Sequence, residues 1–528
     1  MDYAPFQWLM NKYKQTDKKY IYIFLFTFFI GFFTHFFFFS NKFVNHDVLL
    51  NTFIDGYEDY ITAISVGRWS YIFFNWITSG FSMPQVKGLA ALVYMAVSAV
   101  LIVKILKIKN VLLGTLVGGI FATFPSVACS FSYSFSMDTY ALSFLMAILS
   151  VYLIEKTSKV NFLISITALV FSMGIYQSSI TFSIALIFIL LLSDVLTNQI
   201  ILKNFIRKVL RYLVFLILGL GIYLIISKGA MFVMGIEANT YRSMDSMAEI
   251  SLSGMLKGVI YSYAYFGAYF FTTYYLYAPY RVAFNVLAGL IAVLLLIPFY
   301  KKWISEKKIH NIWISSLLII LTPVGLNSIP VLMGNTVETG IHRIMLFSLV
   351  FLYILYMKLI DINISTKERR SLCKKTVVQW LGLFPLLMAI HTGFLICNQA
   401  YDRMNARYEN IYAYLNRVAT RMEEIPEWNH DIPVYFANPA AIFNDNYSVE
   451  IEAYDKLKRM MGTDLYPWYS AEQIATFMEI YLHFNVEEVD EEYEKEIYES
   501  GEFKEMPVFP AKDSIKVING VMVVKLDK

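Results

Sequence analysis

The chain has 528 residues, of which 57% are hydrophobic, 17% aromatic and only 16% charged. This composition excludes a large soluble enzyme and is typical of a polytopic membrane protein. The net charge of +3 conceals an asymmetry, because more than half of the 41 acidic residues follow residue 396, whereas Lys and Arg cluster in short segments before it. The sequence therefore predicts two physically different parts, a transmembrane domain over 1–396 and a soluble domain over 397–528.

Taken in chain order, about eleven apolar runs approach the length that spans a bilayer. They cover 20–39, 85–106, 111–126, 139–154, 161–176, 179–196, 210–227, 282–300, 311–327, 343–360 and 377–396. The first run exceeds a signal-peptide core and lacks a small-residue cleavage site, so we expect an uncleaved anchor. We expect ionisable residues to be almost absent from the interior of the spans, with only His35 and His391 clearly inside. This scarcity disfavours an ion-coupled transporter, which needs a titratable group in the bilayer.

The cations occupy every second loop, which predicts the orientation of the chain, since short cytoplasmic loops are enriched in Lys and Arg. The clusters are Lys12 to Lys19, Lys104 to Lys109, Lys156 to Lys159, Lys203 to Arg211, Lys301 to Lys308 and Lys367 to Lys375. We therefore expect the N-terminus inside. The loops 40–84, 127–138, 228–281 and 328–342 and the segment 397–528 then lie on the extracytoplasmic face of the plasma membrane.

The segment 255–280 carries many tyrosines and is long enough to span. Counting it as a span would break the alternation of charge at Lys301, and tyrosine rings prefer the headgroup level. We favour an interfacial or re-entrant segment, with an ordinary transmembrane helix as the alternative.

The first outer loop predicts an amphipathic helix over 47–64. One side of it carries polar residues, namely Asp47, Asn51, Asp55, Asp59 and Thr62, and the other side carries Leu49, Phe53, Tyr57, Tyr60, Ile61 and Ile64. Such a helix would lie along the membrane surface with its apolar side toward the acyl chains. The alternative is an ordinary connector with a solvated face.

Carboxylates at the edge of a bilayer suit acid–base chemistry on a lipid-borne substrate. Asp47 lies nearest the end of the first span, where partial desolvation raises the pKa of a carboxylate toward that of a general base. We predict Asp47 as the catalytic base and Asp55 as its rival. A divalent cation on Asp55, Glu58 and Asp59 is conceivable but is not required, so we expect no metal and no cofactor.

The outer loops also carry cations that suit a phosphate group. Arg68, in Gly67-Arg68-Trp69, combines a guanidinium with a membrane-surface indole, and a guanidinium binds phosphate bidentately. Further candidates for phosphate binding are Arg242, Arg281, His342 and Arg343. Each of these is, alternatively, an interfacial anchor.

Several further residues of the outer loops are candidates for binding a polar substrate, which the resemblance described below makes a sugar or its acceptor. They are Glu58, Asp59, Trp69, Asp138 and Gln177. Asp138 precedes an apolar run and is alternatively a helix cap. Gln177 either binds sugar hydroxyls or closes a hairpin. Glycine-rich phosphate loops and zinc motifs are absent from the sequence, which disfavours nucleotide hydrolysis and a structural zinc site.

After residue 397 the pattern predicts a compact extracytoplasmic α/β domain. We expect helices over 400–424 and 470–483 and a strand over 431–436. The sequence Asn519-Gly520 between two apolar stretches predicts a β-hairpin at the end of the chain.

Five short motifs resemble the Gtr-type (GtrII-like) membrane glucosyltransferases, whose architecture is GT-C-like. The motifs are Asn45-His46-Asp47, Gly67-Arg68-Trp69, Phe135-Ser136-Met137-Asp138, Gly174-Ile175-Tyr176-Gln177 and the C-terminal Asp513-Ser514-Ile515-Lys516-Val517. Members of this family often carry paired Asp in the first loop. Here His46 replaces the first of the pair, which leaves the choice of catalytic carboxylate open.

The resemblance implies transfer of a hexose, commonly glucose, from a polyprenyl-phosphate sugar to a cell-envelope polysaccharide or teichoic-acid-type acceptor on the outer face of a bacterial plasma membrane. We expect direct displacement with inversion, the bilayer as a partner and no nucleic acid. Two other classes of protein stay open, namely a lipid-linked oligosaccharide flippase or transporter, and an envelope sensor or structural protein.

Overall fold

The computed structural model describes residues 16–41, 43, 46–50, 57–197, 201–239, 251–276, 278–365, 376–439 and 470–526. The chain divides into two compact units. The first unit comprises Met1–Phe39 and Asp55–Asn398, and the second comprises Ser40–Ile54 and Gln399–Lys528. Each unit is treated separately below.

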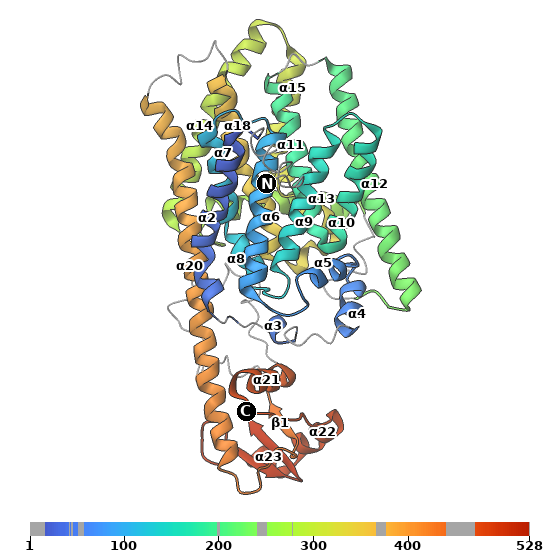
Figure 1. Cartoon of the computed structure of the whole chain (residues 1–528), viewed down its shortest axis with the longest axis vertical. Helices are drawn as coiled ribbons and strands as arrows, with labels where there is room; N and C mark the ends of the chain where they lie inside the picture. The colour runs from blue at the N-terminus through green and yellow to red at the C-terminus, as the bar shows by residue number, and fades with distance from the viewer. Residues whose placement is uncertain are drawn as a thin grey trace, which may run out of the picture. The chain divides into compact units, whose positions relative to one another are not determined.

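The first unit is helical (Figure 1). Its first half contains α2 (Lys18–Ser40), α4 (Tyr57–Ser65), α5 (Tyr71–Ile77), α6 (Pro84–Ile105), α7 (Val111–Thr123), α8 (Pro125–Phe131), α9 (Met137–Ile154), α10 (Lys159–Ile175), the 3₁₀ turn η1 (Gln177–Ser179) and α11 (Ile180–Thr197). Its second half contains α12 (Leu202–Met234), α13 (Leu252–Phe271), α14 (Pro279–Ser305), α15 (Ile309–Ile320), α16 (Thr322–Leu326), α17 (Ile329–Met333), η4 (Gly334–Thr339), η5 (Arg343–Val350), α18 (Phe351–Ser365) and the first part of α20 (Thr376–Glu423).

Among the described residues, eight helices are long and apolar enough to cross a membrane, or nine if the bent pair α7 and α8 counts as one span. The protein is therefore a polytopic helical membrane protein. The predicted run 111–126 is not straight, because the helix bends by 45° where Pro125 follows Phe124. The predicted run 311–327 is likewise divided between α15 and α16.

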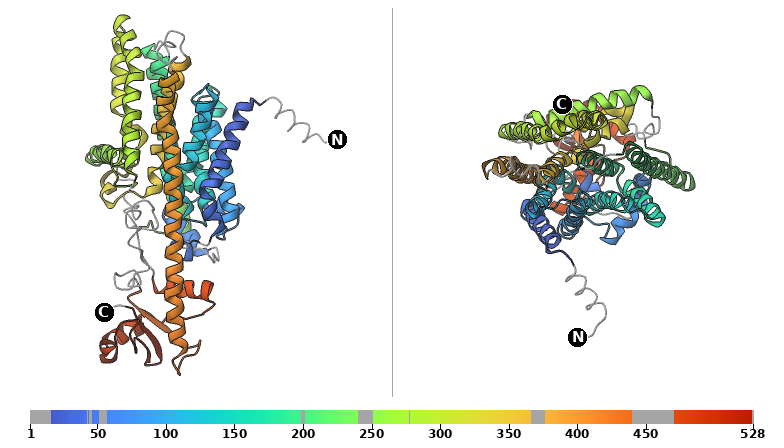
Figure 2. Two further views of the ribbon diagram at one scale, coloured as in Figure 1. Left: turned by 90° about the vertical axis from the view of Figure 1, so that its left-hand side faces the viewer. Right: turned by 90° about the horizontal axis from the view of Figure 1, so that it is seen from above.

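Small residues let the helices of the first unit pack closely. Ala91 and Ala99 of α6 and Ala147 of α9 are fully buried, and α6 and α9 lie in contact. Small side chains allow close approach of helices in a membrane, where the hydrophobic effect supplies little attraction between them. Elsewhere α14 and α15 form an antiparallel pair that runs side by side (Figure 2), joined by a 3.0 Å hydrogen bond between the hydroxyls of Tyr300 and Ser316.

The tyrosine-rich segment forms one helix, α13, which packs on the broken region after α15. The Ser262 hydroxyl donates to the carbonyl of Asn327 at 2.9 Å. A Cβ added at Gly258 would lie 2.5 Å from the backbone of Val331, so this glycine permits the close approach of α13 and α17. With 20 residues α13 is long enough to cross a membrane, but it is not among the helices that are also apolar enough.

The expectation that His35 and His391 are the only ionisable groups inside the spans is wrong. Lys87 of α6 is fully buried, and Lys358 and Asp361 of α18 are 8% and 2% exposed. Each of these charges has an oppositely charged neighbour within 4.0 Å. Pairing of this kind is how membrane helices accommodate charge.

The second unit contains a three-stranded sheet covered by helices. Its elements are α3 (His46–Leu50), the end of α20, β1 (Val434–Ala437), α21 (Ala471–Phe477), the π-helical turn η10 (Met478–Leu482), α22 (Glu491–Glu499), α23 (Gly501–Glu505), β2 (Ile515–Ile518) and β3 (Val521–Lys525). The strand order is β1-β3-β2, with β1 parallel and β2 antiparallel to β3. The predicted hairpin is confirmed, and its turn residues Asn519 and Gly520 both have positive φ, as a type I′ turn requires.

The prediction of an amphipathic helix over 47–64 is wrong about where the apolar side of its first part is buried. Residues 47–50 belong to α3, and residues 57–64 belong to α4 of the other unit, while 51–56 lie outside the described residues. Leu49 of α3 is 1% exposed and joins the core of the second unit with Leu415, Ile474 and Met522. The apolar side of α3 is therefore buried in protein rather than in acyl chains.

Gly393 tests the packing at the bend between α7 and α8. A Cβ at this position would lie 2.2 Å from the carbonyl oxygen of Thr123. We expect Gly393→Val to destabilise the detergent-solubilised protein by about 1–3 kcal/mol, since rigid backbone must move to admit the side chain. Gly289→Val is the matched control, because a Cβ there meets nothing within 4 Å. Equal melting temperatures for the two variants would contradict this account of the packing.

Candidate functional site

The loop that carries Arg68 is fixed to the C-terminal end of α10. The amide of Ser70 donates to the carbonyl of Gly174 at 3.0 Å, and the Ser70 hydroxyl donates to the carbonyl of Phe171 at 2.9 Å. The ring of Trp69 packs on Phe171 with centroids 5.3 Å apart. The structure thus brings together two of the motifs found in the sequence, Gly67-Arg68-Trp69 and Gly174-Ile175-Tyr176-Gln177.

Glycine is required on both sides of this contact. Gly67 has a φ of +77°, and a Cβ there would lie 2.6 Å from the Tyr223 hydroxyl. A Cβ at Gly174 would lie 2.7 Å from the Trp69 ring. Any larger side chain would therefore separate the loop from α10.

Arg68 is a partly buried cation. Its guanidinium lies over the ring of Tyr176, 5.3 Å from the centroid. Within the described part of the chain, its buried Nε has no hydrogen-bond partner and no carboxylate forms an ion pair with it, and the buried indole nitrogen of Trp69 also has no partner. Gln177 closes the hairpin, since its amide donates to the carbonyl of Val66. Buried donors without protein partners are suited to a ligand or to water.

A chain of aromatic contacts, here called the tyrosine network, leads from Arg68 to His342. The ring of Tyr176 lies 4.8 Å from that of Tyr140, and Tyr140 lies 5.9 Å from Tyr133. The Tyr133 hydroxyl and His342 Nε2 are 3.1 Å apart, at hydrogen-bonding distance. The tyrosine network therefore connects Arg68 to His342, which are far apart in the sequence.

The cations Arg343 and Arg281 lie on a second series of rings. The Arg343 guanidinium is 4.4 Å from the centroid of Tyr275, and Tyr275 is 6.3 Å from Tyr269. Arg281 is 4% exposed and donates from Nη1 and Nη2 to the carbonyls of Tyr269 and Thr272, at 2.6 and 3.0 Å. Two nitrogen atoms of Arg281 thus donate to carbonyls at the end of α13. This structural contact leaves fewer N–H groups of Arg281 for a phosphate.

Asp138 forms a buried ion pair that the sequence did not reveal. Its carboxylate lies 3.5 Å from Nζ of Lys87, and the two residues are 1% and 0% exposed. Nζ of Lys87 also donates to Asn75 at 2.8 Å and to Thr78 at 3.2 Å, and the Thr78 hydroxyl donates to Asp138. Asp138 is therefore satisfied by side chains of α5 and α6 and does not act as a simple helix cap.

The remaining predicted site residues lie elsewhere. Asp47 is a partly buried residue of α3 in the second unit. Glu58 and Asp59 lie on α4 of the first unit, but their side chains are outside the described part of the structure. Asp55 and Arg242 are wholly outside it. Among the residues that are described, no three His, Cys, Asp or Glu side chains are grouped to hold a metal ion.

Sequence analysis overlooked Lys87 and the tyrosines of the network. Lys87 lies inside the predicted run 85–106, and a lysine in an apolar run is itself a signal of a buried partner. Tyr133, Tyr140 and Tyr176 gave no such signal, because tyrosine is frequent throughout this chain, which has 38 of them.

Comparison with known proteins gives one match. The model of the family described as Glucosyl transferase GtrII matches residues 36–357, which is more than half of the chain. The match includes Arg68, Asp138 and the whole tyrosine network, whereas the C-terminal hairpin that contributed to the resemblance lies outside it. Searches of curated proteins and of solved structures found no match.

The ion pair of Lys87 and Asp138 predicts a large effect on stability. Lys87→Met leaves a buried carboxylate without its cation, which typically costs about 3–5 kcal/mol. Adding Asp138→Asn to this variant removes the charge and should restore part of the loss. The measurement is thermal unfolding in detergent, with Lys203→Met, which removes an exposed lysine, as the control. A Lys87→Met variant as stable as this control would show that the pair is not a structural element.

Proposed function

Because the chain belongs to the Glucosyl transferase GtrII family, we propose that it transfers glucose from a polyprenyl-phosphate-linked donor to a cell-envelope glycan on the outer face of the membrane. The family supplies the glucosyl transfer. The kind of donor, the acceptor and the face of the membrane are proposed from the chemistry and position of the residues described above.

The observation that carries this proposal is the environment of Arg68. Its guanidinium is held by a rigid loop over an aromatic ring and, among the described residues, lacks a carboxylate partner. A cation in this state attracts an anion from outside the protein. Because a guanidinium matches phosphate geometrically, and because lipid reaches a membrane-embedded site directly, we assign Arg68 to the phosphate of the lipid donor. His342, across the tyrosine network, is the second candidate for this role.

The proposed reaction is a single displacement at the anomeric carbon. A carboxylate takes the proton of an acceptor hydroxyl, the oxygen forms a bond to the anomeric carbon, and the bond from that carbon to the phosphate oxygen breaks. The configuration inverts, and polyprenyl phosphate leaves with the bonding electrons. Negative charge grows on the phosphate as the bond breaks, so a fixed guanidinium stabilises the transition state more than the ground state.

The base is one of the acidic residues of the first loop. Asp138 is unsuited, because it is enclosed and neutralised by Lys87. Asp47 and Asp55 are the candidates retained from the sequence. Glu58 and Asp59 are further candidates, since α4 ends at Ser65, two residues before Gly67.

The proposed orientation rests on the charges at the two ends of the first unit. Three lysine-rich segments lie at the ends of α6, α12 and α14 that are away from Arg68. They are Lys104 to Lys109, Lys203 to Arg211 and Lys301 to Lys308. Lysine-rich ends favour the cytoplasm. Arg68 and the tyrosine network would then face outward, where the acceptor polymer is located.

Reconstitution tests the proposal as a whole. The purified protein is incubated with polyprenyl-phosphate glucose and isolated envelope polymer, with and without a chelator. We expect glucose to appear on the polymer in both cases. Transfer that stops with the chelator would contradict metal independence. Movement of the lipid across vesicles without any transfer would favour the flippase instead.

Arg68→Gln should lower the rate of transfer by about 10²–10³, the usual loss when one donor to a developing anion is removed. The protein should fold normally, because the guanidinium makes no ion pair with the described residues. Arg207→Gln, which alters an exposed arginine of α12, is the matched control and should transfer at the rate of the unaltered protein. Normal turnover by Arg68→Gln would remove Arg68 from the mechanism.

Four single substitutions, each of which replaces a carboxylate by the corresponding amide, identify the base. Asp47→Asn, Asp55→Asn, Glu58→Gln and Asp59→Asn are compared, and one of them should lose about 10²–10⁴ in rate while the others change little. The unaltered folding of each variant is checked by its melting temperature, and Asp431→Asn, on the exposed surface of the second unit, is the control. If all four variants keep full activity, the base does not belong to the first loop.

A further inference from the structure

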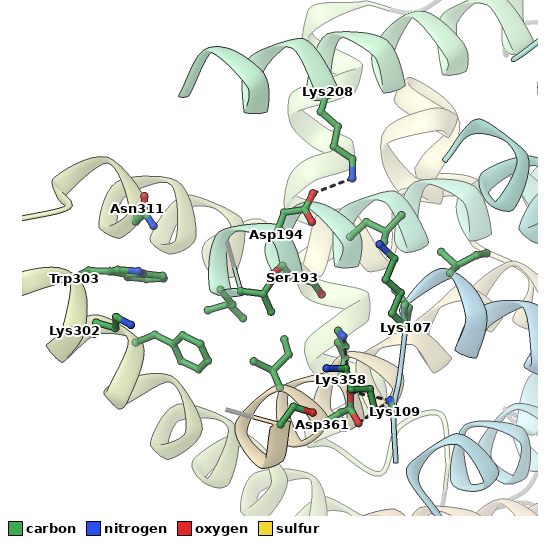
Figure 3. Close-up of a pocket in the computed structure, with 18 of the residues that line it drawn as sticks. Lys107, Lys109, Ser193, Asp194, Lys208, Lys302, Trp303, Asn311, Lys358 and Asp361 are labelled. Carbon is green, nitrogen blue, oxygen red and sulfur yellow. Dashed lines mark hydrogen bonds and ion pairs between the residues drawn. The ribbon is translucent and has the colours of Figure 1, made fainter. Parts of the chain in front are cut away.

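A cavity of the first unit lies at the end of the bundle away from Arg68. It has a volume of 440 Å³ and is bounded by the C-terminal ends of α6, α9, α11, α14 and α18 and by the N-terminal parts of α12 and α15 (Figure 3). This size is within the range of cavities that hold small ligands. None of the residues assigned above to glucosyl transfer lines it.

One corner of the cavity carries an excess of positive charge. Lys107, Lys109 and Lys358 line this corner together with Asp361 (Figure 3). The carboxylate of Asp194, which also acts on Lys358, is paired with Lys208. Asp361 is already committed, because it accepts from the backbone amides of Lys109 and Asn110, at 2.9 to 3.1 Å, at the start of α7. Lys358 is 4.0 Å from Asp361, and the ammonium groups of Lys107 and Lys109 form no ion pair with any described residue.

The other charges around the cavity are balanced. Lys208 lies between Asp194 at 2.9 Å and Glu155 at 3.3 Å. Glu306 lies between Lys308 at 2.6 Å and Lys302 at 3.8 Å. The positive potential is therefore concentrated at the corner formed by Lys107, Lys109 and Lys358, and not spread over the whole rim.

The opposite wall offers polar groups that lack partners. Asn311 of α15 is 1% exposed, and neither its amide nitrogen nor its amide oxygen has a hydrogen-bond partner among the described residues. It lines the cavity together with Trp303 (Figure 3). A buried carboxamide with both functions unused is suited to a ligand hydroxyl, which donates and accepts at once.

We propose that this cavity binds the headgroup of an anionic phospholipid. The lysine corner takes the phosphodiester, and Asn311 takes a hydroxyl of the headgroup. Phe299, Leu190 and Ile362 give the cavity an apolar wall for the glycerol backbone. Basic pockets between membrane helices on the cytoplasmic side recognise anionic headgroups in this manner, and the lysine-rich loops predict that side for this end. Phosphatidylglycerol combines both groups and is the probe of choice.

The test uses the full-length protein in neutral detergent. Binding of phosphatidylglycerol and of phosphatidylcholine is measured by native mass spectrometry, and the melting temperature is recorded with each lipid. We expect tighter binding of phosphatidylglycerol and a rise in melting temperature with that lipid alone. The double variant Lys107→Gln with Lys109→Gln should weaken its binding about thirtyfold. The single variant Asn311→Leu should also weaken the binding of phosphatidylglycerol, and it should leave the binding of phosphatidylcholine unchanged.

The control variant is Lys203→Gln with Lys301→Gln, which removes two exposed lysines near the same end that do not line the cavity. It should bind phosphatidylglycerol like the unaltered protein. An equal loss in both double variants would show attraction by general charge and overturn the proposal. Displacement of the lipid by inorganic phosphate would also overturn the proposal, because it would identify phosphate as the ligand. Stronger binding of polyprenyl phosphate would overturn it in the same way. Melting temperatures without lipid reveal any variant that has lost its fold.

Discussion

The buried ion pair between Lys87 and Asp138 is the interaction on which the Arg68 end of the first unit depends. It joins α6 to α9, and through Asn75 and Thr78 it also holds α5. α5 begins directly after the loop of Gly67 to Ser70, so this anchor limits where the loop can lie. The loop in turn places Arg68 over Tyr176. Two charges in a nonpolar interior are costly, and they persist here because every proton of the Lys87 ammonium has a partner.

The cations of this end illustrate how a residue type alone does not fix a role. Lys87 is neutralised by Asp138, and Arg281 donates to two backbone carbonyls, so both stabilise the fold. Arg68 differs from them, because its described neighbours are aromatic rings and backbone rather than carboxylates. The pairing of each cation thus separates a structural cation from one that is available to an anionic substrate. The corner formed by Lys107, Lys109 and Lys358 shows the same imbalance at the other end.

The sequence predicted the class of fold, most of the spans and the C-terminal hairpin, because hydropathy and the Asn519-Gly520 turn are local signals. It also selected Arg68, Trp69, Gln177 and His342, which the structure brings into one region. It failed where the outcome depended on tertiary partners. The apolar face of α3 could be buried in lipid or in protein, and periodicity cannot distinguish the two. The sequence likewise did not reveal Lys87 as the partner of Asp138, because the two residues are 51 positions apart in the chain.

The central claim is that Arg68 holds the phosphate of the lipid-linked donor. A structure of the protein determined with bound polyprenyl-phosphate glucose tests it most directly. The account predicts the phosphate oxygens about 2.7–2.9 Å from the Arg68 guanidinium, the distance of a charge-assisted hydrogen bond, with the sugar close to the first loop. A phosphate bound at Lys107, Lys109 and Lys358 instead, with Arg68 making no contact to the donor, would contradict it.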